Sequence, residues 1–219
     1  MEENIREFIT RSPGKILLCG GYLILSPRNS GLVVDVDTYF NCKSRVTYVK
    51  STINFKTLLV KIYSANFNLD YIYEINITNS DNNTYLNILN KKNENNNEFI
   101  YFSLIFAFYL VINEYNDIFP LTCFIDEINI VLEGDQYFYS FEKGTNSNKK
   151  TGLGSSSALI VSLLTNIFLI FVVGNKAGKT SGSITNILTE EQMVKVLLFS
   201  LIANNYAQKK VVFPTQIGR

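Results

Sequence analysis

The sequence predicts an α+β domain, with strands in the first part of the chain and helices in the second. Up to roughly residue 65, apolar residues alternate with polar ones or form short runs bounded by turn residues, which is typical of strands. From Phe99 onward, apolar residues recur at helical spacing over longer segments. Strands followed by helices indicate an α+β domain and not a doubly wound α/β sheet.

Each expected element follows from a local pattern. Apolar runs or alternation between turn residues predict strands at residues 16–25, 32–39, 44–49, 58–63, 71–77 and 124–133. Helical spacing of apolar residues predicts helices at residues 99–113, 155–173 and 190–208. The last helix is expected to be capped by Thr189 or a neighbouring residue, with two glutamates in its first turn, where carboxylates suit the helix dipole.

Two polar segments are expected to lie outside the packed core. Residues 79–98 are rich in asparagine and predict an exposed polar insertion. Residues 142–150 are polar and predict a turn-rich stretch. We therefore expect one domain at residues 1–208, which contains the insertion, and a loop at residues 209–219.

The composition excludes several classes of function. The 219 residues carry a net charge of +1, so neither nucleic acid nor a membrane surface is an expected partner. Histidine is absent, which removes the commonest general base and most zinc sites. The three cysteines form no CxxC pair and indicate free thiols in a reducing, cytoplasmic compartment. The apolar run at residues 158–173 is shorter than the ~20 residues of a membrane span and predicts a buried helix.

A glycine-serine cluster directly before the apolar helix carries the strongest chemical signal. Glycines let the backbone turn sharply and approach a ligand, serines add hydroxyl groups, and the free N–H groups of a helix start favour phosphate oxygens. The preceding Lys149 and Lys150 add positive charge. A helix start with ordinary N-capping is the alternative, since the segment is neither a Walker A loop nor GxGxxG. The residues expected to bind phosphate are Gly152, Leu153, Gly154, Ser155, Ser156 and Ser157.

A second motif lies near the N-terminus. Pro13, Gly14 and Lys15 precede the first expected strand, and Gly20-Gly21-Tyr22 follows its apolar run. The alternative interpretation is a Pro-Gly turn into a core strand, with the two later glycines at a bulge and the tyrosine packed at the sheet edge.

Together the two motifs resemble the GHMP kinase superfamily, which combines an N-terminal P-G-K strand motif with a central G-L-G-S-S-A phosphate loop. Residues 13–25, P-G-K-I-L-L-C-G-G-Y-L-I-L, look most like the eukaryotic phosphomevalonate kinase branch, and so do residues 150–158, K-T-G-L-G-S-S-S-A. Mevalonate kinases usually have G-E-H where this chain has G-G-Y, which makes that branch the weaker match. The resemblance covers the N-terminal portion of such enzymes.

The resemblance implies a fold, a reaction and a set of site residues. The fold is that of the GHMP kinase N-terminal domain, similar to the ribosomal protein S5 domain 2-like fold, with a mixed or antiparallel sheet packed with helices. The reaction is transfer of the γ-phosphoryl group of ATP, with Mg²⁺, to 5-phosphomevalonate in the isoprenoid pathway. The loop would hold ATP, Ser156 would reach the metal, and Lys15 would be catalytic. The expected substrate-binding residues are Lys15, Tyr22 and Lys150.

The chain also departs from the family pattern. No aspartate follows Asp135, whereas the family carries a catalytic aspartate after its last N-terminal helix and then a ferredoxin-like C-terminal domain. The chain is therefore expected to be a fragment or a degenerate, non-catalytic relative, and to be inactive alone. We expect its apolar face, which the second domain would cover, to support self-association.

Overall fold

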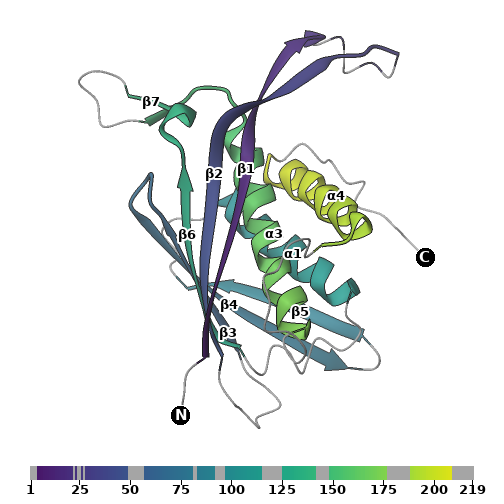
Figure 1. The fold of residues 1–219 in the computed structure, drawn as a ribbon. Helices are drawn as coiled ribbons and strands as arrows, with labels where there is room; N and C mark the ends of the chain where they lie inside the picture. Colours follow the sequence, from purple (N-terminus) through teal and green to yellow (C-terminus); the bar gives the residue numbers. More distant parts are fainter. Residues whose placement is uncertain are drawn as a thin grey trace.

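The computed structural model of the chain describes residues 4–21, 23, 26, 28–48, 57–80, 83–91, 97–114, 125–141, 148–176 and 188–208 (Figure 1). Its centre is a six-stranded sheet in the order β1-β2-β6-β3-β4-β5, and β7 and β8 form a separate two-stranded sheet. The strands are β1 (Asn4–Cys19), β2 (Leu32–Tyr48), β3 (Leu58–Ser64), β4 (Leu69–Ser80), β5 (Asn83–Asn90), β6 (Ile125–Gly134), β7 (Tyr139–Phe141) and β8 (Asn148–Lys150).

The six-stranded sheet is mixed. β3 and β6 run parallel, and every other neighbouring pair in this sheet is antiparallel. The outer parts of β1 and β2 extend beyond the rest of the sheet as a two-stranded ribbon (Figure 1). The predicted α+β fold with a mixed sheet and packed helices is confirmed.

The helices lie on one face of this sheet (Figure 1). They are α1 (Glu98–Glu114), α3 (Ser155–Lys176) and α4 (Glu190–Ala207). α3 packs against β1 and β2 and against α1, and α4 packs on α1 and α3 as an outer layer. The three predicted helices are confirmed, and Thr189 is the capping residue of α4, where it forms a capping box with Gln192.

The helix α3 is long and apolar enough, by length and composition alone, to cross a membrane. Its apolar stretch, Ser155–Val173, is longer than the sequence pattern indicated, and most of it is buried inside the domain. Phe168 and Phe171, for example, are both fully buried. This burial is the behaviour of a core helix.

Polar contacts fix α3 on the sheet. The buried Asn166 amide donates to the carbonyl of Phe8 at 3.4 Å and to that of Cys42 at 3.1 Å. Thr10 Oγ1 donates to the carbonyl of Ser162 at 2.7 Å. A buried polar group is costly unless it is paired, so these bonds specify one position of the helix along β1 and β2.

The outer face of α4 is apolar. Its side chains at the surface are between 49% and 63% exposed, namely Met193, Val194, Leu197, Leu198 and Leu201. The inner face packs on α1, where the Tyr206 ring lies 5.4 Å from that of Phe102 and 5.2 Å from that of Phe106. A helix that is apolar on both faces is typical of one covered on both sides.

Several predicted boundaries are wrong. β1 begins at Asn4 and ends at Cys19, so the strand expected at residues 16–25 lies mostly past its end. The strands expected at 32–39 and 44–49 are one continuous strand, β2. The segment 79–98 holds the end of β4, the strand β5 and the first residue of α1. Residues 148–150, expected as turn, form β8, and the tail at 209–219 lies outside the described residues.

Candidate functional site

The glycine-serine motif forms a short loop between β8 and α3. Two hydrogen bonds anchor its start: the Thr151 N–H donates to the carbonyl of Phe138 at 3.0 Å, and Thr151 Oγ1 donates to the carbonyl of Tyr137 at 2.7 Å. Gly152 and Gly154 have φ angles of 86° and 76°. Only glycine adopts this left-handed region without strain, so the backbone itself requires the two glycines of the motif.

The loop ends at the start of α3. The Ala158 N–H donates to the carbonyl of Gly154 at 3.0 Å, which makes this glycine the capping residue of the helix. The N–H groups of the next three residues therefore have no carbonyl partner within the helix. Ser156 and Ser157 are half-buried, whereas Ser155 is buried at 6% exposure. The accessible donors of the first turn are thus concentrated at Ser156 and Ser157.

Lys15 lies against this loop, as the two-motif hypothesis predicts. Its backbone N–H donates to the carbonyl of Leu153 at 2.9 Å, which joins the edge of β1 to the loop. A Cβ atom added at Gly154 would lie 3.2 Å from Lys15 Cγ and 3.3 Å from Lys15 Cε. The lysine side chain therefore passes directly over Gly154. Two motifs far apart in the sequence form one surface.

Gly14 is required for a different reason. A Cβ atom at this position would lie 2.8 Å from Thr38 Cγ2 and 3.0 Å from both Phe138 Cε1 and Val36 Cγ2. The register of β1 and β2 shifts between Pro13 and Gly14, next to this close approach. Gly14 thus lets β1 pass close to Phe138, whose carbonyl anchors the loop, and Lys15 is the next residue of the strand.

Lys150 reaches the first turn of α3 from the end of β8. Its ammonium donates to Ser156 Oγ at 2.8 Å and lies 5.2 Å from the centroid of the Phe99 ring. The side chain as a whole is exposed, but its ammonium end is partly desolvated, which lowers the pKa of Lys150 below its usual value. A second lysine is therefore held at the helix start.

The remaining predicted residues are placed as follows. Leu153 is half-buried and packs against the core, so its part in the site is the backbone carbonyl that Lys15 binds. Tyr22 and the side chain of Lys149 lie outside the described residues.

Asp35 and Phe99 lie beside the site, and the sequence did not predict a part for either residue. Asp35 is directly opposite Lys15 in the register of β1 and β2, and both are exposed. Side chains directly opposite each other lie on one face with Cβ atoms about 4.5–5.5 Å apart. The alternating Asp35-Val36-Asp37 pattern is the available signal for this carboxylate. Phe99, which the sequence places only in a helix, contributes its ring to Lys150.

The residues fit a magnesium ion that arrives with a nucleotide. The described part of the chain holds no group of three or more acidic, cysteine or histidine side chains that could bind a metal by itself. Mg²⁺ is commonly held by one or two protein oxygens together with substrate phosphates. Ser156 Oγ already faces a cation, the Lys150 ammonium, so this oxygen is placed to receive positive charge.

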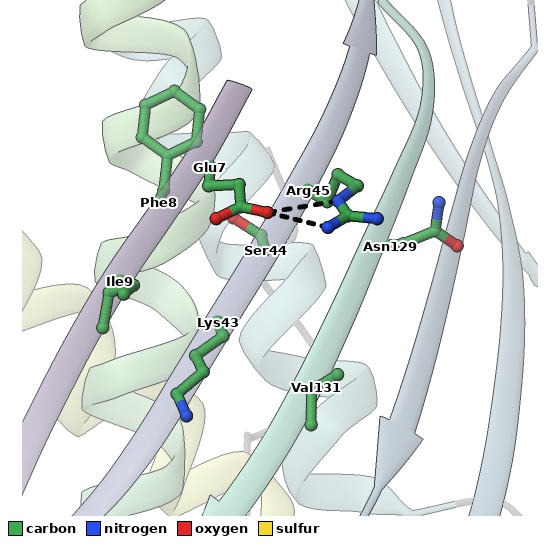
Figure 2. Close-up of a pocket in the computed structure, with 8 residues that line it drawn as sticks. All are labelled: Glu7, Phe8, Ile9, Lys43, Ser44, Arg45, Asn129 and Val131. Atoms are coloured by element: carbon green, nitrogen blue, oxygen red, sulfur yellow. Dashed lines mark hydrogen bonds and ion pairs between the residues drawn. The ribbon is translucent and has the colours of Figure 1, made fainter. Parts of the chain in front are cut away.

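A separate pocket of about 400 Å³ lies on the sheet, away from the two motifs (Figure 2). Its lining comes from β1, β2 and β6 and contains none of the predicted site residues. Arg45 and Glu7 form an ion pair there at 2.9 Å, so these two charges already satisfy each other. The pocket is open to solvent and Ile9, on its wall, is 66% exposed. We assign it no part in phosphate binding.

Comparison with known proteins supports the fold. No protein-family model and no curated protein matches the chain. The Lin0012 protein from Listeria innocua has a TM-score of 0.51 and 14% identity over 93% of this chain and 43% of that chain. Mevalonate kinase from Methanococcus jannaschii has a TM-score of 0.47 and 13% identity, covering 93% and 48%. Phosphomevalonate kinase from Streptococcus pneumoniae has a TM-score of 0.41 and 16% identity, covering 93% and 50%.

The chain therefore shares the fold of part of the Listeria protein and spans half or less of the length of these solved structures. Two of these neighbours are named as a mevalonate kinase and a phosphomevalonate kinase.

Proposed function

We propose that this chain is the nucleotide-binding part of an ATP-dependent small-molecule kinase of the GHMP kinase superfamily. The observation that carries the proposal is the position of the Lys15 side chain over Gly154, at the start of α3. A bare glycine-serine turn is often only a helix cap. A lysine from a distant strand, bonded to the same loop through Leu153, is not needed for capping and supports a phosphate site.

The proposed site binds a phosphate chain with three kinds of group. The N–H groups of the first turn of α3 and the positive end of its dipole receive phosphate oxygens. Ser156 and Ser157 add hydroxyl groups, and Lys15 and Lys150 supply point charges. Magnesium, bound with the nucleotide, would neutralise charge on the phosphate oxygens, with Ser156 as its protein ligand. Lys15, next to the transferring phosphoryl group, is the catalytic candidate.

The proposed acceptor is 5-phosphomevalonate, which would become 5-diphosphomevalonate. The support is the G-G-Y motif at Gly20, Gly21 and Tyr22 together with the K-T-G-L-G-S-S-S-A loop. A related kinase such as mevalonate kinase is a second candidate, and Gly21 argues against it. Binding without transfer is a third, favoured by the lack of any aspartate after Asp135.

Nucleotide binding is tested by titrating ATP, ADP and adenosine into the purified chain by calorimetry. We expect ATP and ADP to bind and adenosine to bind much more weakly, because the site holds phosphates. Lys15→Met should weaken ATP binding about 10–100-fold, the value of one charged hydrogen bond. Lys43→Met removes the same charge on the outer face of the sheet and is the matched control. Equal ATP affinity of the two variants would refute the proposed site.

A further inference from the structure

Lys150 is held where two helices begin. Its ammonium binds Ser156 Oγ at 2.8 Å, in the first turn of α3, and lies 5.2 Å from the ring centroid of Phe99, in the first turn of α1. The lysine thus places a full positive charge beside two helix N-termini.

The start of α3 is an unfavourable place for a cation on its own, because its first turn holds no acidic residue, whereas Glu98 supplies a negative charge in the first turn of α1. The N-terminus of a helix carries a partial positive charge, which repels an ammonium and attracts an anion. Partial desolvation of the Lys150 ammonium, which lowers its pKa, adds to the cost of the charge. The hydrogen bond to Ser156 and the face of the Phe99 ring offset part of this cost. The arrangement becomes favourable as a whole once an anion sits above the helix start.

The oxygen that holds Lys150 is also the one that the proposed function assigns to magnesium. A serine hydroxyl has two acceptor lone pairs, so an ammonium and a metal ion could in principle share it. Two cations on one oxygen would lie roughly 4–5 Å apart and would repel each other strongly. Ser156 therefore favours one cation at a time.

We propose that Lys150 is a built-in cation at the metal position, which binds phosphate oxygens when magnesium is absent and leaves Ser156 when a magnesium-nucleotide binds. This rests on the proposed function, because it concerns the same loop. The Phe99 ring, 5.2 Å from the ammonium while Ser156 holds it, would continue to attract the ammonium after it leaves the hydroxyl. Lys150 is thus a positioning residue that makes nucleotide binding less dependent on magnesium.

The test is ATP affinity measured by calorimetry in EDTA and in saturating Mg²⁺. We expect Lys150→Met to weaken ATP binding about 10–100-fold in EDTA, because a charged hydrogen bond to phosphate is lost, and less than about threefold in Mg²⁺. Phe99→Leu should weaken ATP binding both in EDTA and in Mg²⁺, by a smaller factor than Lys150→Met in EDTA. Lys150→Arg should restore most of the affinity in EDTA, and Lys43→Met should match the wild type in both conditions.

The outcomes separate this inference from the proposed function. Equal loss of affinity in EDTA and in Mg²⁺, or no loss in either, would show that Lys150 does not stand in for the metal. Thermal melting of each variant identifies any loss that comes from misfolding, and the arginine variant keeps the test valid if Lys150→Met folds poorly. If wild-type protein binds ATP in neither condition, the proposed function is wrong and this inference falls with it.

Discussion

Replacing Gly154 with alanine tests whether Lys15 and the loop act as one site. The added Cβ would lie 3.2 Å from Lys15 Cγ and 3.3 Å from Cε, so the lysine side chain must shift. The φ of 76° adds a backbone penalty of about 1–2 kcal/mol for a residue with a Cβ. For a chain of this size, that loss of unfolding free energy corresponds to a melting temperature lower by roughly 2–8 °C.

Gly152 provides a matched control. Its φ is 86°, and a Cβ there meets no atom within 4 Å, so Gly152→Ala carries the same backbone penalty without touching Lys15. Thermal melting of both variants should therefore show similar losses of stability. Loss of ATP affinity in Gly154→Ala should come largely from the displaced lysine.

A double-mutant cycle isolates that coupling. ATP affinity is measured by calorimetry for the wild type, Gly154→Ala, Lys15→Met and the double variant. We expect the effect of Gly154→Ala on affinity to shrink by most of its size when Lys15 is already methionine. An undiminished effect in the double variant would show that the loop and Lys15 bind independently, and the reasoning from their contact would be refuted.

Three further predictions follow from burial: two concern Cys42, and one concerns the exposed face of α4. Cys42 is buried, and burial raises its pKa, whereas Cys19 is exposed, so a thiol reagent should label Cys19 and spare Cys42 until the chain unfolds. Because the Cys42 thiol ionises more readily in the unfolded chain, the free energy of unfolding should fall as pH rises above the ordinary thiol pKa of about 8.5. Denaturation at several pH values measures this fall for the wild type and for Cys42→Ser. A fall that is no larger in the wild type than in Cys42→Ser would contradict the prediction. The apolar outer face of α4 predicts self-association of two copies, so sedimentation should show a mass that rises with protein concentration. The double variant Leu197→Asp, Leu201→Asp should abolish this rise. An unchanged rise would place the contact elsewhere.

The helices of this domain are predictable from sequence because each is an apolar segment of 17–22 residues, longer than a typical strand. The strand β5 is harder, because asparagines surround a short alternating pattern. Ile88 is buried and Leu86 is partly buried, and both lie on the side that faces the core. The composition of this segment resembles a polar insertion, and alternation over so few residues is weak evidence against it. The three-residue strands β7 and β8 show no periodicity that a pattern could reveal.

Part of the candidate site is likewise predictable from sequence, and part of it is not. The glycine-serine loop is predictable because its glycines, its serines and the helix that follows are contiguous. The position of Asp35 opposite Lys15 depends on strand register, and the register of β1 and β2 shifts twice, between Pro13 and Gly14 and between Leu17 and Cys19. A shift of one residue moves a side chain to the other face of the sheet, so spacing in the sequence does not determine such a pair.

The same structure explains how like charges can be kept together at the loop. Lys15, Lys150 and the positive end of α3 converge there, which costs free energy in the absence of an anion. Local interactions offset only part of this cost, so the helix must also be fixed from elsewhere. Asn166, buried near the middle of α3, donates to a carbonyl of β1 and to one of β2, and removing its amide would remove both bonds. Rigid attachment in the core thus holds the helix start beside Lys15, and the phosphate binding that we propose would relieve the strain.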